Sequence, residues 1–247
     1  MQSWREYWNG PHPIYVNARH RTLHFDLIAR DVAKLIPAPD AQALDYGCGE
    51  ADTARELAAR CGRLFLFDTA DSVRARLVER HAGDARIAVL DEAGLARIPD
   101  GSLDLMVVNS VAQYLTRDEL KSVLAFARGK LKPTGRLALG DVIPADANAV
   151  SDTRALLDFA FKGGFLIAAL IGLVRTALSD YRKLRERLGL TRYAPADVLA
   201  LLAEAGFAGE RAPRNIGHNQ ERMLFLASPI APTAASPDAG SDVGTAA

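Results

Sequence analysis

Residues 43 to 54 read ALDYGCGEADTA, and this stretch predicts a short buried strand, a glycine turn and the start of a helix. Asp45 lies near the end of the strand, and Gly47 and Gly49 permit a tight turn with space for a ligand. A threonine and a glutamate have the spacing of a capping box, so we expect a helix to begin near Thr53. In an open α/β sheet, such a turn borders the crevice outside the carboxyl ends of the strands, where nucleotide-like ligands bind.

The charges of this turn indicate which ligand it binds. A dinucleotide-binding turn has a third glycine and holds a pyrophosphate at the N-terminus of the following helix. Asp52 occupies that position here, and its carboxylate would repel a pyrophosphate. We expect Asp45 to face the same crevice, and residues 43 to 54 contain no basic residue. The turn therefore favours a cationic ligand without phosphate, such as S-adenosylmethionine, over a nicotinamide dinucleotide.

Four more apolar segments predict strands, and each ends at or near an acid or an amide. They are RLFLFD at 63 to 68, RIAVLDE at 86 to 92, LDLMVV at 103 to 108 followed by Asn109 and Ser110, and RLALGDVI at 136 to 143 with Asp141 near its end. Together with the helices between them, this order indicates a parallel sheet. An acid followed by G-x-G, with polar residues at the next strand ends, resembles the class I S-adenosylmethionine-dependent methyltransferases. Ala51 replaces the third glycine that is common in that family.

The resemblance implies a fold and a set of residues around the methyl donor. The fold is a Rossmann-like, doubly wound α/β sheet, mostly parallel, with an antiparallel last strand and a helical insertion after the fifth strand. The acid at the end of the family's second strand contacts the ribose hydroxyls, which assigns that part to Asp68, and Asp91 or Glu92 would contact the adenine amino group. The residues expected at the donor are Asp45, Tyr46, Gly47, Gly49, Asp68, Asp91, Glu92, Asn109 and Ser110.

We expect three parts along the chain. They are an N-terminal helical cap over residues 1 to 40, a methyltransferase domain over 41 to 228 with a helical lid at 145 to 193, and a disordered tail over 229 to 247. The remaining pattern predicts helices at 18–35, 53–61, 71–81, 117–131 and 194–206, and strands at 208–214 and 221–228.

Composition excludes several classes of partner. The 247 residues carry 30 basic and 30 acidic side chains, so no basic field favours nucleic acid. Cys48 and Cys61 match neither a zinc pattern nor a disulfide framework, and we interpret Cys48 as a small turn residue rather than a nucleophile. No cluster of ligands at metal-binding spacing stands out, so we predict no metal. The N-terminus lacks an apolar signal core, which predicts a cytoplasmic protein.

The segment GGFLIAALIGLV, residues 163 to 174, is apolar on all sides, so we expect both of its faces to be buried. It is too short to span a bilayer, which needs about 20 residues. Arg175, Arg182, Lys183, Arg185 and Arg187 follow it. Two interpretations stay open. The favoured one is a lid helix buried against the domain or against a second subunit in a homodimer. The other is a lid that admits a lipid-like acceptor, with peripheral membrane contact and membrane association of the protein.

Few residues are candidates for chemistry on the acceptor. His20 and His24 share one face of the predicted N-terminal helix, and Tyr114 follows the strand end nearest the methyl group. We predict these three as catalytic residues, with packing as the alternative role, and Asp141 as a group that holds an acceptor hydroxyl or amine. The predicted function is methyl transfer from S-adenosylmethionine to a small-molecule acceptor, with a lipophilic one favoured. The alternative is a catalytically silent scaffold or regulatory subunit that binds the donor.

Overall fold

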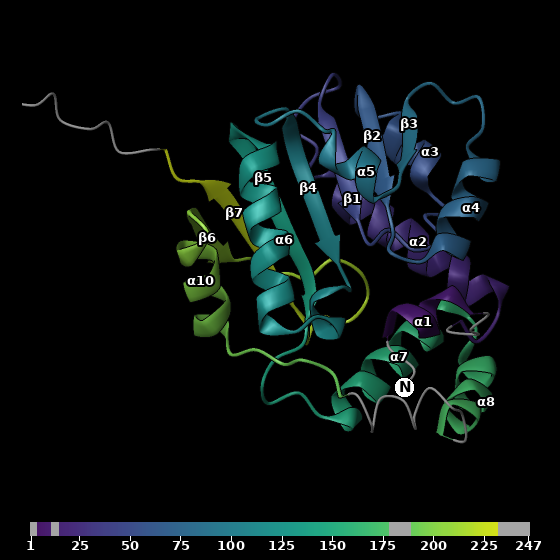
Figure 1. Ribbon diagram of the computed structural model, residues 1–247. Helices are drawn as coiled ribbons and strands as arrows, with labels where there is room; N and C mark the ends of the chain where they lie inside the picture. Colours follow the sequence, from purple (N-terminus) through teal and green to yellow (C-terminus); the bar gives the residue numbers. More distant parts are fainter. Residues whose placement is uncertain (1–3, 11–14, 178–188, 232–247) are drawn as a thin grey trace, which may run out of the picture.

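The computed structural model describes residues 4–10, 15–177 and 189–231. A sheet of seven strands in the order β3-β2-β1-β4-β5-β7-β6 forms its centre (Figure 1). The strands are β1 (Gln42–Tyr46), β2 (Arg63–Phe67), β3 (Ile87–Leu90), β4 (Leu103–Asn109), β5 (Leu131–Val142), β6 (Phe207–Arg211) and β7 (Met223–Pro229).

The first five strands pair in parallel, and β7 runs antiparallel to both β5 and β6. The strand order reverses between β1 and β4, which is the topological switch point where open α/β sheets bind ligands. The glycine turn follows β1, so it lies at this switch point. The predicted fold class, including the antiparallel last strand and the insertion after β5, is confirmed.

Helices cover both faces of the sheet. On one face lie α2 (Ala18–Ala33), α3 (Ala54–Ala58) and α4 (Asp71–Arg80). On the other lie α5 (Glu92–Ala96), α6 (Arg117–Lys130) and α10 (Pro195–Glu204). Three further helices, α1 (Trp4–Asn9), α7 (Ala149–Gly163) and α8 (Leu166–Ala177), gather beyond the carboxyl ends of the parallel strands (Figure 1).

The two cores follow from the alternation of side chains along the strands. Ala43 and Leu105 face the core under α2, α3 and α4, whereas Leu44 and Met106 face the core under α5, α6 and α10. All four are 3% exposed or less. Strands that are apolar at consecutive positions are buried on both faces, as expected for a parallel sheet between helices.

Local predictions differ from the structure at two places. Thr53 is the N-cap of α3, but its side chain donates to the carbonyl oxygen of Phe25 and no capping box forms. Strand β3 ends at Leu90, because Asp91 already caps α5, a helix that the sequence analysis did not predict. The predicted tail over 229 to 247 lies outside the described residues from residue 232 onward.

The insertion is a helical hairpin rather than one continuous apolar helix. Helix α7 ends at Gly163, and Gly164 turns the chain with a φ of +69° before α8 begins. The inner face of α8 is buried, with Ala169 at 0% exposure, but Ile167 on its outer face is 77% exposed. The expectation that both faces of this segment are buried is therefore wrong for the described residues.

Ala51, which replaces the third glycine, adopts a strained backbone conformation. It has a φ of +42°, in the region that favours glycine, and is 7% exposed. Left-handed geometry costs an alanine about 1–2 kcal/mol, whereas losing a buried methyl costs about 0.8 kcal/mol. We expect Ala51→Gly to raise the free energy of unfolding by up to about 1 kcal/mol in denaturant titrations. Ala127→Gly, inside α6, should lower it by about 1 kcal/mol or more, and equal losses in both variants would contradict the assignment of strain.

Candidate active site

Hydrogen bonds hold the glycine turn against the end of β2. The amides of Gly47 and Cys48 both donate to the carbonyl oxygen of Phe67, at 2.7 and 3.0 Å. Gly47 has a φ of +76°, and a Cβ on it would lie 2.4 Å from Cγ2 of Val111. A larger residue would therefore push the turn away from the loop that follows β4.

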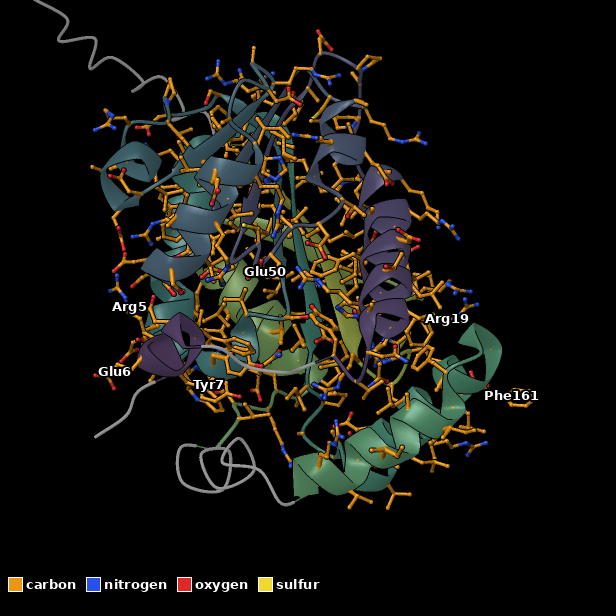
Figure 2. The ribbon with its side chains drawn as sticks, turned by 90° about the vertical axis from the view of Figure 1, so that its right-hand side faces the viewer. Arg5, Glu6, Tyr7, Arg19, Glu50 and Phe161 are labelled. Atoms are coloured by element: carbon orange, nitrogen blue, oxygen red, sulfur yellow. The ribbon has the colours of Figure 1, made fainter. Side chains whose placement is uncertain are left out.

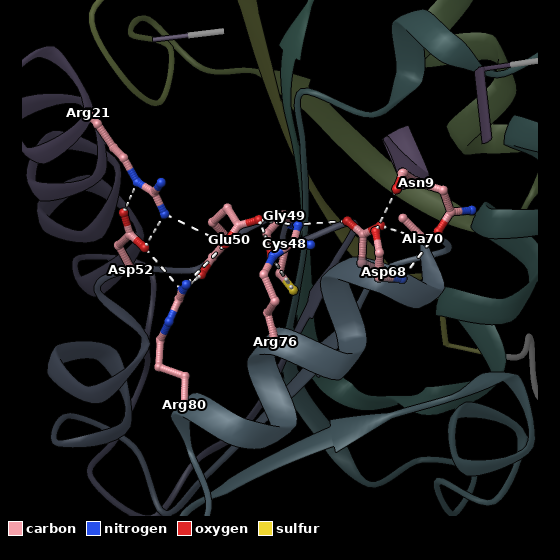
Figure 3. Close-up of polar contacts among 11 residues, drawn as sticks. Asn9, Arg21, Cys48, Gly49, Glu50, Asp52, Asp68, Ala70, Arg76 and Arg80 are labelled. Carbon is pink, nitrogen blue, oxygen red and sulfur yellow. Dashed lines mark hydrogen bonds and ion pairs between the residues drawn. The ribbon is translucent and has the colours of Figure 1, made fainter. Parts of the chain in front are cut away.

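Asp68 joins this turn to the start of α4. Its carboxylate accepts the Gly49 amide at 3.0 Å with one oxygen and the Ala70 amide at 2.9 Å with the other (Figure 3). Arg74 donates to the carbonyl oxygen of Asp68 at 2.6 Å, so the residue is held from both its main chain and its side chain. The carboxylate is fixed in position before any ligand arrives.

Asp45 lies next to Asp68 without a compensating partner. Burial, and then the charge of Asp68, raise the pKa of Asp45 to about 7. Burial likewise raises the pKa of Asp68, although its two amide donors act in the opposite direction. Within the described part of the chain, no group donates a hydrogen bond to the Asp45 carboxylate. The two acids therefore form a negative centre that a bound cation would stabilise.

The other two acids of the turn are neutralised by arginines from distant helices. Asp52 pairs with Arg21 of α2 and with Arg80 of α4, and Glu50 pairs with Arg76 and Arg80 (Figure 3). The sequence analysis counted Asp52 as an uncompensated charge, and that was wrong. The cause is tertiary, because the arginines lie 28 and 31 residues away from Asp52.

The structure separates the roles of the two acids after β3. Asp91 accepts the Gly94 amide at 2.7 Å and thereby caps α5. Glu92 pairs with Arg5 of α1 at 2.8 Å and lies 3.5 Å from Arg74. The geometry does not choose between them as the contact for adenine, so both stay predictions.

Helix α1 lies beyond the carboxyl ends of the strands, beside this site (Figure 1). Its last residue, Asn9, accepts the Ser72 amide at 3.2 Å with its side chain and the Ser72 hydroxyl at 3.0 Å with its carbonyl oxygen. Near the end of β4, the ring of Tyr114 lies 4.8 Å from Trp4 and 5.4 Å from Trp8, between ring centroids. Tyr114 thus packs against the N-terminal cap that the sequence predicts.

A second polar group lies at the ends of β4 and β5. The Ser110 hydroxyl donates to the Asp141 carboxylate at 2.8 Å, and the Asn109 amide donates to Ser110 at 3.3 Å. Ser110 and Asp141 have φ of +60° and +57°, unfavourable for residues with a side chain. Asn215, which the sequence analysis missed, accepts the Asp141 amide at 3.0 Å. Strain of this kind gathers at functional sites, and burial raises the pKa of Asp141.

The predicted catalytic histidines lie inside an aromatic cluster. His20 stacks on Phe165 with ring centroids 5.0 Å apart, and His218 stacks on Phe159 at 4.6 Å. His24 lies between them and contacts both His218 and Tyr15. Burial lowers the pKa of all three imidazoles, to about 3 for His24 and about 4 for His218. A base that works near neutral pH needs a pKa close to 7, so the geometry favours the packing role.

This cluster predicts acid-sensitive stability. The folded pKa values of His24 and His218 lie below 6.5, so unfolding binds protons and stability falls as the pH drops below 6.5. Each histidine should cost about 2 kcal/mol between pH 7 and 5. The groups facing the cluster are the Tyr15 ring and, beside His218, the ion pair of Asp152 with Arg222.

Denaturant titrations at both pH values measure this effect. His24→Phe should remove its share of the loss. His81→Phe, which changes a histidine outside the cluster whose pKa is lowered less, should remove a smaller share. An unchanged pH dependence in His24→Phe would contradict a neutral buried imidazole in the folded protein.

Comparisons with known proteins show which domain this chain is similar to. Residues 44 to 139 match the family described as "Methyltransferase domain". Ribosomal protein L11 methyltransferase of Paraburkholderia phymatum is 30% identical over 122 residues, which cover 49% of this chain and 39% of that protein. The chain thus spans well under half the length of the curated relatives that it matches.

Solved structures share the fold over most of the chain. N-methyltransferase NodS of Bradyrhizobium japonicum WM9, in complex with S-adenosyl-L-homocysteine, is 19% identical with a TM-score of 0.55, covering 90% of this chain and 94% of that one. Magnesium protoporphyrin IX methyltransferase of Synechocystis PCC 6803, with bound S-adenosylmethionine, is 14% identical with a TM-score of 0.55, covering 92% and 89%.

Residues 44 to 139 therefore match a methyltransferase domain on a Rossmann-like sheet, in agreement with the resemblance to the class I S-adenosylmethionine-dependent methyltransferases inferred from the sequence. The cofactor predicted from the sequence is the methyl donor of this class. Among the described residues, no three or more His, Cys, Asp or Glu side chains come together as metal ligands do. The same residues include no helix with the length and apolarity needed to cross a membrane.

Proposed function

We propose that this protein transfers a methyl group from S-adenosylmethionine to a small, lipophilic acceptor. The observation that carries the proposal is the pair of acids at the switch point, Asp45 and Asp68, whose carboxylates form no ion pair with the described residues. The neighbouring acids Glu50 and Asp52 are neutralised, so the net charge beside the turn resides on this pair. S-adenosylmethionine carries cationic sulfonium and ammonium groups and lacks phosphate, so it suits such a centre.

Each donor-binding residue has a separate part in this proposal. Asp68 accepts two ribose hydroxyls, because each carboxylate oxygen keeps a lone pair after accepting one amide. Asp45 balances the positive charge of the methionine moiety. Gly47 and Gly49 let the backbone approach the ligand, and Tyr46 lies beside them at the end of β1. Asp91 or Glu92 contacts the adenine, and Asn109 and Ser110 lie beside the methyl group.

The chemistry needs orientation more than activation. The bound donor supplies a methyl group on a sulfonium sulfur that is already a good leaving group. Holding an acceptor in line with it can lower the barrier by up to about 7–11 kcal/mol. For an acceptor that must lose a proton, the group placed to receive it is the Asp141 carboxylate, whose raised pKa makes it a better base than an ordinary aspartate. Ser110 holds that carboxylate at 2.8 Å.

Two observations favour a lipophilic small molecule as the acceptor. The insertion after β5 places aromatic and aliphatic side chains beside the carboxyl ends of the strands, with Phe159 and Phe165 packed on His20 of α2. The acid that it places there, Asp152, is paired with Arg222. The curated relatives are named for a ribosomal protein substrate, but their match covers only 49% of this chain. We therefore infer the class of acceptor from the side chains of the insertion rather than from the substrate of those relatives.

Donor binding distinguishes the two kinds of acid in the turn. Asp68→Asn removes one charge-assisted contact with the ribose, worth about 1.5–3 kcal/mol, and should weaken S-adenosylmethionine binding by roughly ten- to a hundred-fold in calorimetry. Asp52→Asn is the matched control, because its partners are Arg21 and Arg80, and it should leave the affinity within about three-fold. Equal effects of both substitutions would contradict the assignment of Asp68, and tight binding of NAD would contradict a site for a cationic ligand without phosphate.

Methyl transfer is measured with label in the donor methyl group and a cell lysate as the acceptor source, with the organic extract and the protein counted separately after the reaction. Asp141→Asn keeps the shape of the side chain but removes the base, so transfer should fall by about 100-fold or more while donor affinity stays unchanged. Asp146→Asn, an exposed acid in the loop after β5, is the control that should retain transfer. Label found only in ribosomal protein would contradict the acceptor class. Donor binding without any transfer would favour the silent scaffold.

A further inference from the structure

One face of α8 presents an uninterrupted apolar stripe to solvent. Ile167, Leu170, Ile171 and Val174 follow one another at helical spacing and are 77, 49, 49 and 62% exposed. A helix of a soluble protein ordinarily directs such a stripe into the core and its polar side outward. Here the apolar stripe lies on the outside of the hairpin.

The packing of the opposite face fixes this orientation. Ala169 is fully buried and Phe165 is 4% exposed, in a small core with Val16 and Leu23. Gly172 lies so close to Val16 that a Cβ on the glycine would be 2.2 Å from its Cγ1. Rotating α8 to bury the stripe would break these contacts, so the stripe stays exposed while the hairpin stays docked.

Helix α7 extends the apolar surface at both of its ends. Val150 is 76% exposed and Phe161 is 73% exposed, and Figure 2 shows Phe161 directed away from the body of the protein. Of the eight large apolar residues exposed in the described part of the chain, six belong to this hairpin, and the other two are Val78 and Ile230. We call the six residues, Val150, Phe161, Ile167, Leu170, Ile171 and Val174, the apolar face.

The charged residues of the hairpin around the apolar face are mainly basic. Arg154, Lys162 and Arg175 are exposed, and the one exposed acid described on the two helices, Asp158, is paired with Lys162. Arg19 of α2 donates to the carbonyl oxygen of Gly163 and adds another cation at the turn of the hairpin. This distribution is complementary to a negatively charged surface.

We propose that the apolar face docks this protein onto the interface of an anionic lipid bilayer. The apolar side chains enter the boundary between headgroups and acyl chains, and the basic residues contact the anionic headgroups. The hairpin lies at the same end of the sheet as the donor site (Figure 1). Docking would therefore turn the methyl-transfer edge toward the membrane, which supplies the lipophilic acceptor, and only this last step rests on the proposed function.

A bilayer fits the apolar face better than a second protein does. Protein interfaces carry about one hydrogen bond per 100–200 Å² and are anchored by tryptophan, tyrosine and arginine. None of the six side chains of the apolar face forms hydrogen bonds, none is a tryptophan, tyrosine or arginine, and Phe161 is their one aromatic ring. A lipid interface needs no such bonds from the stripe.

Vesicle sedimentation of the full chain tests the proposal. The wild-type protein should bind phosphatidylcholine vesicles that contain about 30% phosphatidylglycerol. It should bind vesicles of pure phosphatidylcholine at least about ten-fold more weakly. The double variant Ile167→Asp and Ile171→Asp should lose binding to both, by about 100-fold or more. Val78→Asp, the same substitution at an exposed residue of α4, should bind as the wild type does.

Two further measurements distinguish a loss of membrane binding from unfolding of the variant and from dimerisation. Calorimetry with S-adenosylmethionine checks that the double variant is folded, because the donor site does not include the apolar face. It also separates a failure of membrane docking from a failure of the proposed function. Light scattering reports a second copy as the occupant: a wild-type dimer that the double variant converts to a monomer, with no vesicle binding, would overturn the proposal. Equal binding of wild type and double variant would overturn it as well.

Discussion

The arrangement of the site depends on two buried acids, Asp45 and Asp68, which lie close together at the edge of the sheet. Burial, and then the charge of Asp68, raise the pKa of Asp45 to about 7, and burial also raises the pKa of Asp68. The glycine turn keeps them there, because its amides bond to Phe67 and to Asp68 itself. A bound cation is stabilised by the two carboxylates, because neither of them forms an ion pair within the described part of the chain. The uncompensated negative charge therefore favours cationic ligands.

The surrounding helices divide the sheet edge into two halves. Arginines of α2 and α4 neutralise Glu50 and Asp52, so they confine the negative centre to the ends of β1 and β2. The strained pair of Ser110 and Asp141 occupies the ends of β4 and β5. Helix α1 contacts both halves, through Ser72 after β2 and Tyr114 after β4, and the α7–α8 hairpin packs on α2. In the proposed function, one half of the edge binds the cationic donor, and the other half holds the acceptor beside the Asp141 carboxylate.

The strands, their order and the polar residues at their ends were predictable from the sequence, because apolar runs and glycine turns are local signals. The compensation of Asp52 was not, since it depends on arginines brought in by tertiary packing. The helical spacing that suggested His24 as a base did not predict its packing role, because its pKa depends on burial and on His218 from the loop before β7. The apolar segment was recognised, but only the break at Gly164 reveals which of its faces is exposed.

The central claim is that a cationic donor neutralises the pair of acids, and proton release on binding tests it most directly. Calorimetry in buffers of different ionisation enthalpy measures the protons exchanged when S-adenosylmethionine binds at pH 7. With a pKa of about 7 in the free protein, Asp45 should release about half a proton. Asp45→Asn should abolish that release. No exchange, or an uptake of protons in the wild type that the variant leaves unchanged, would contradict the account.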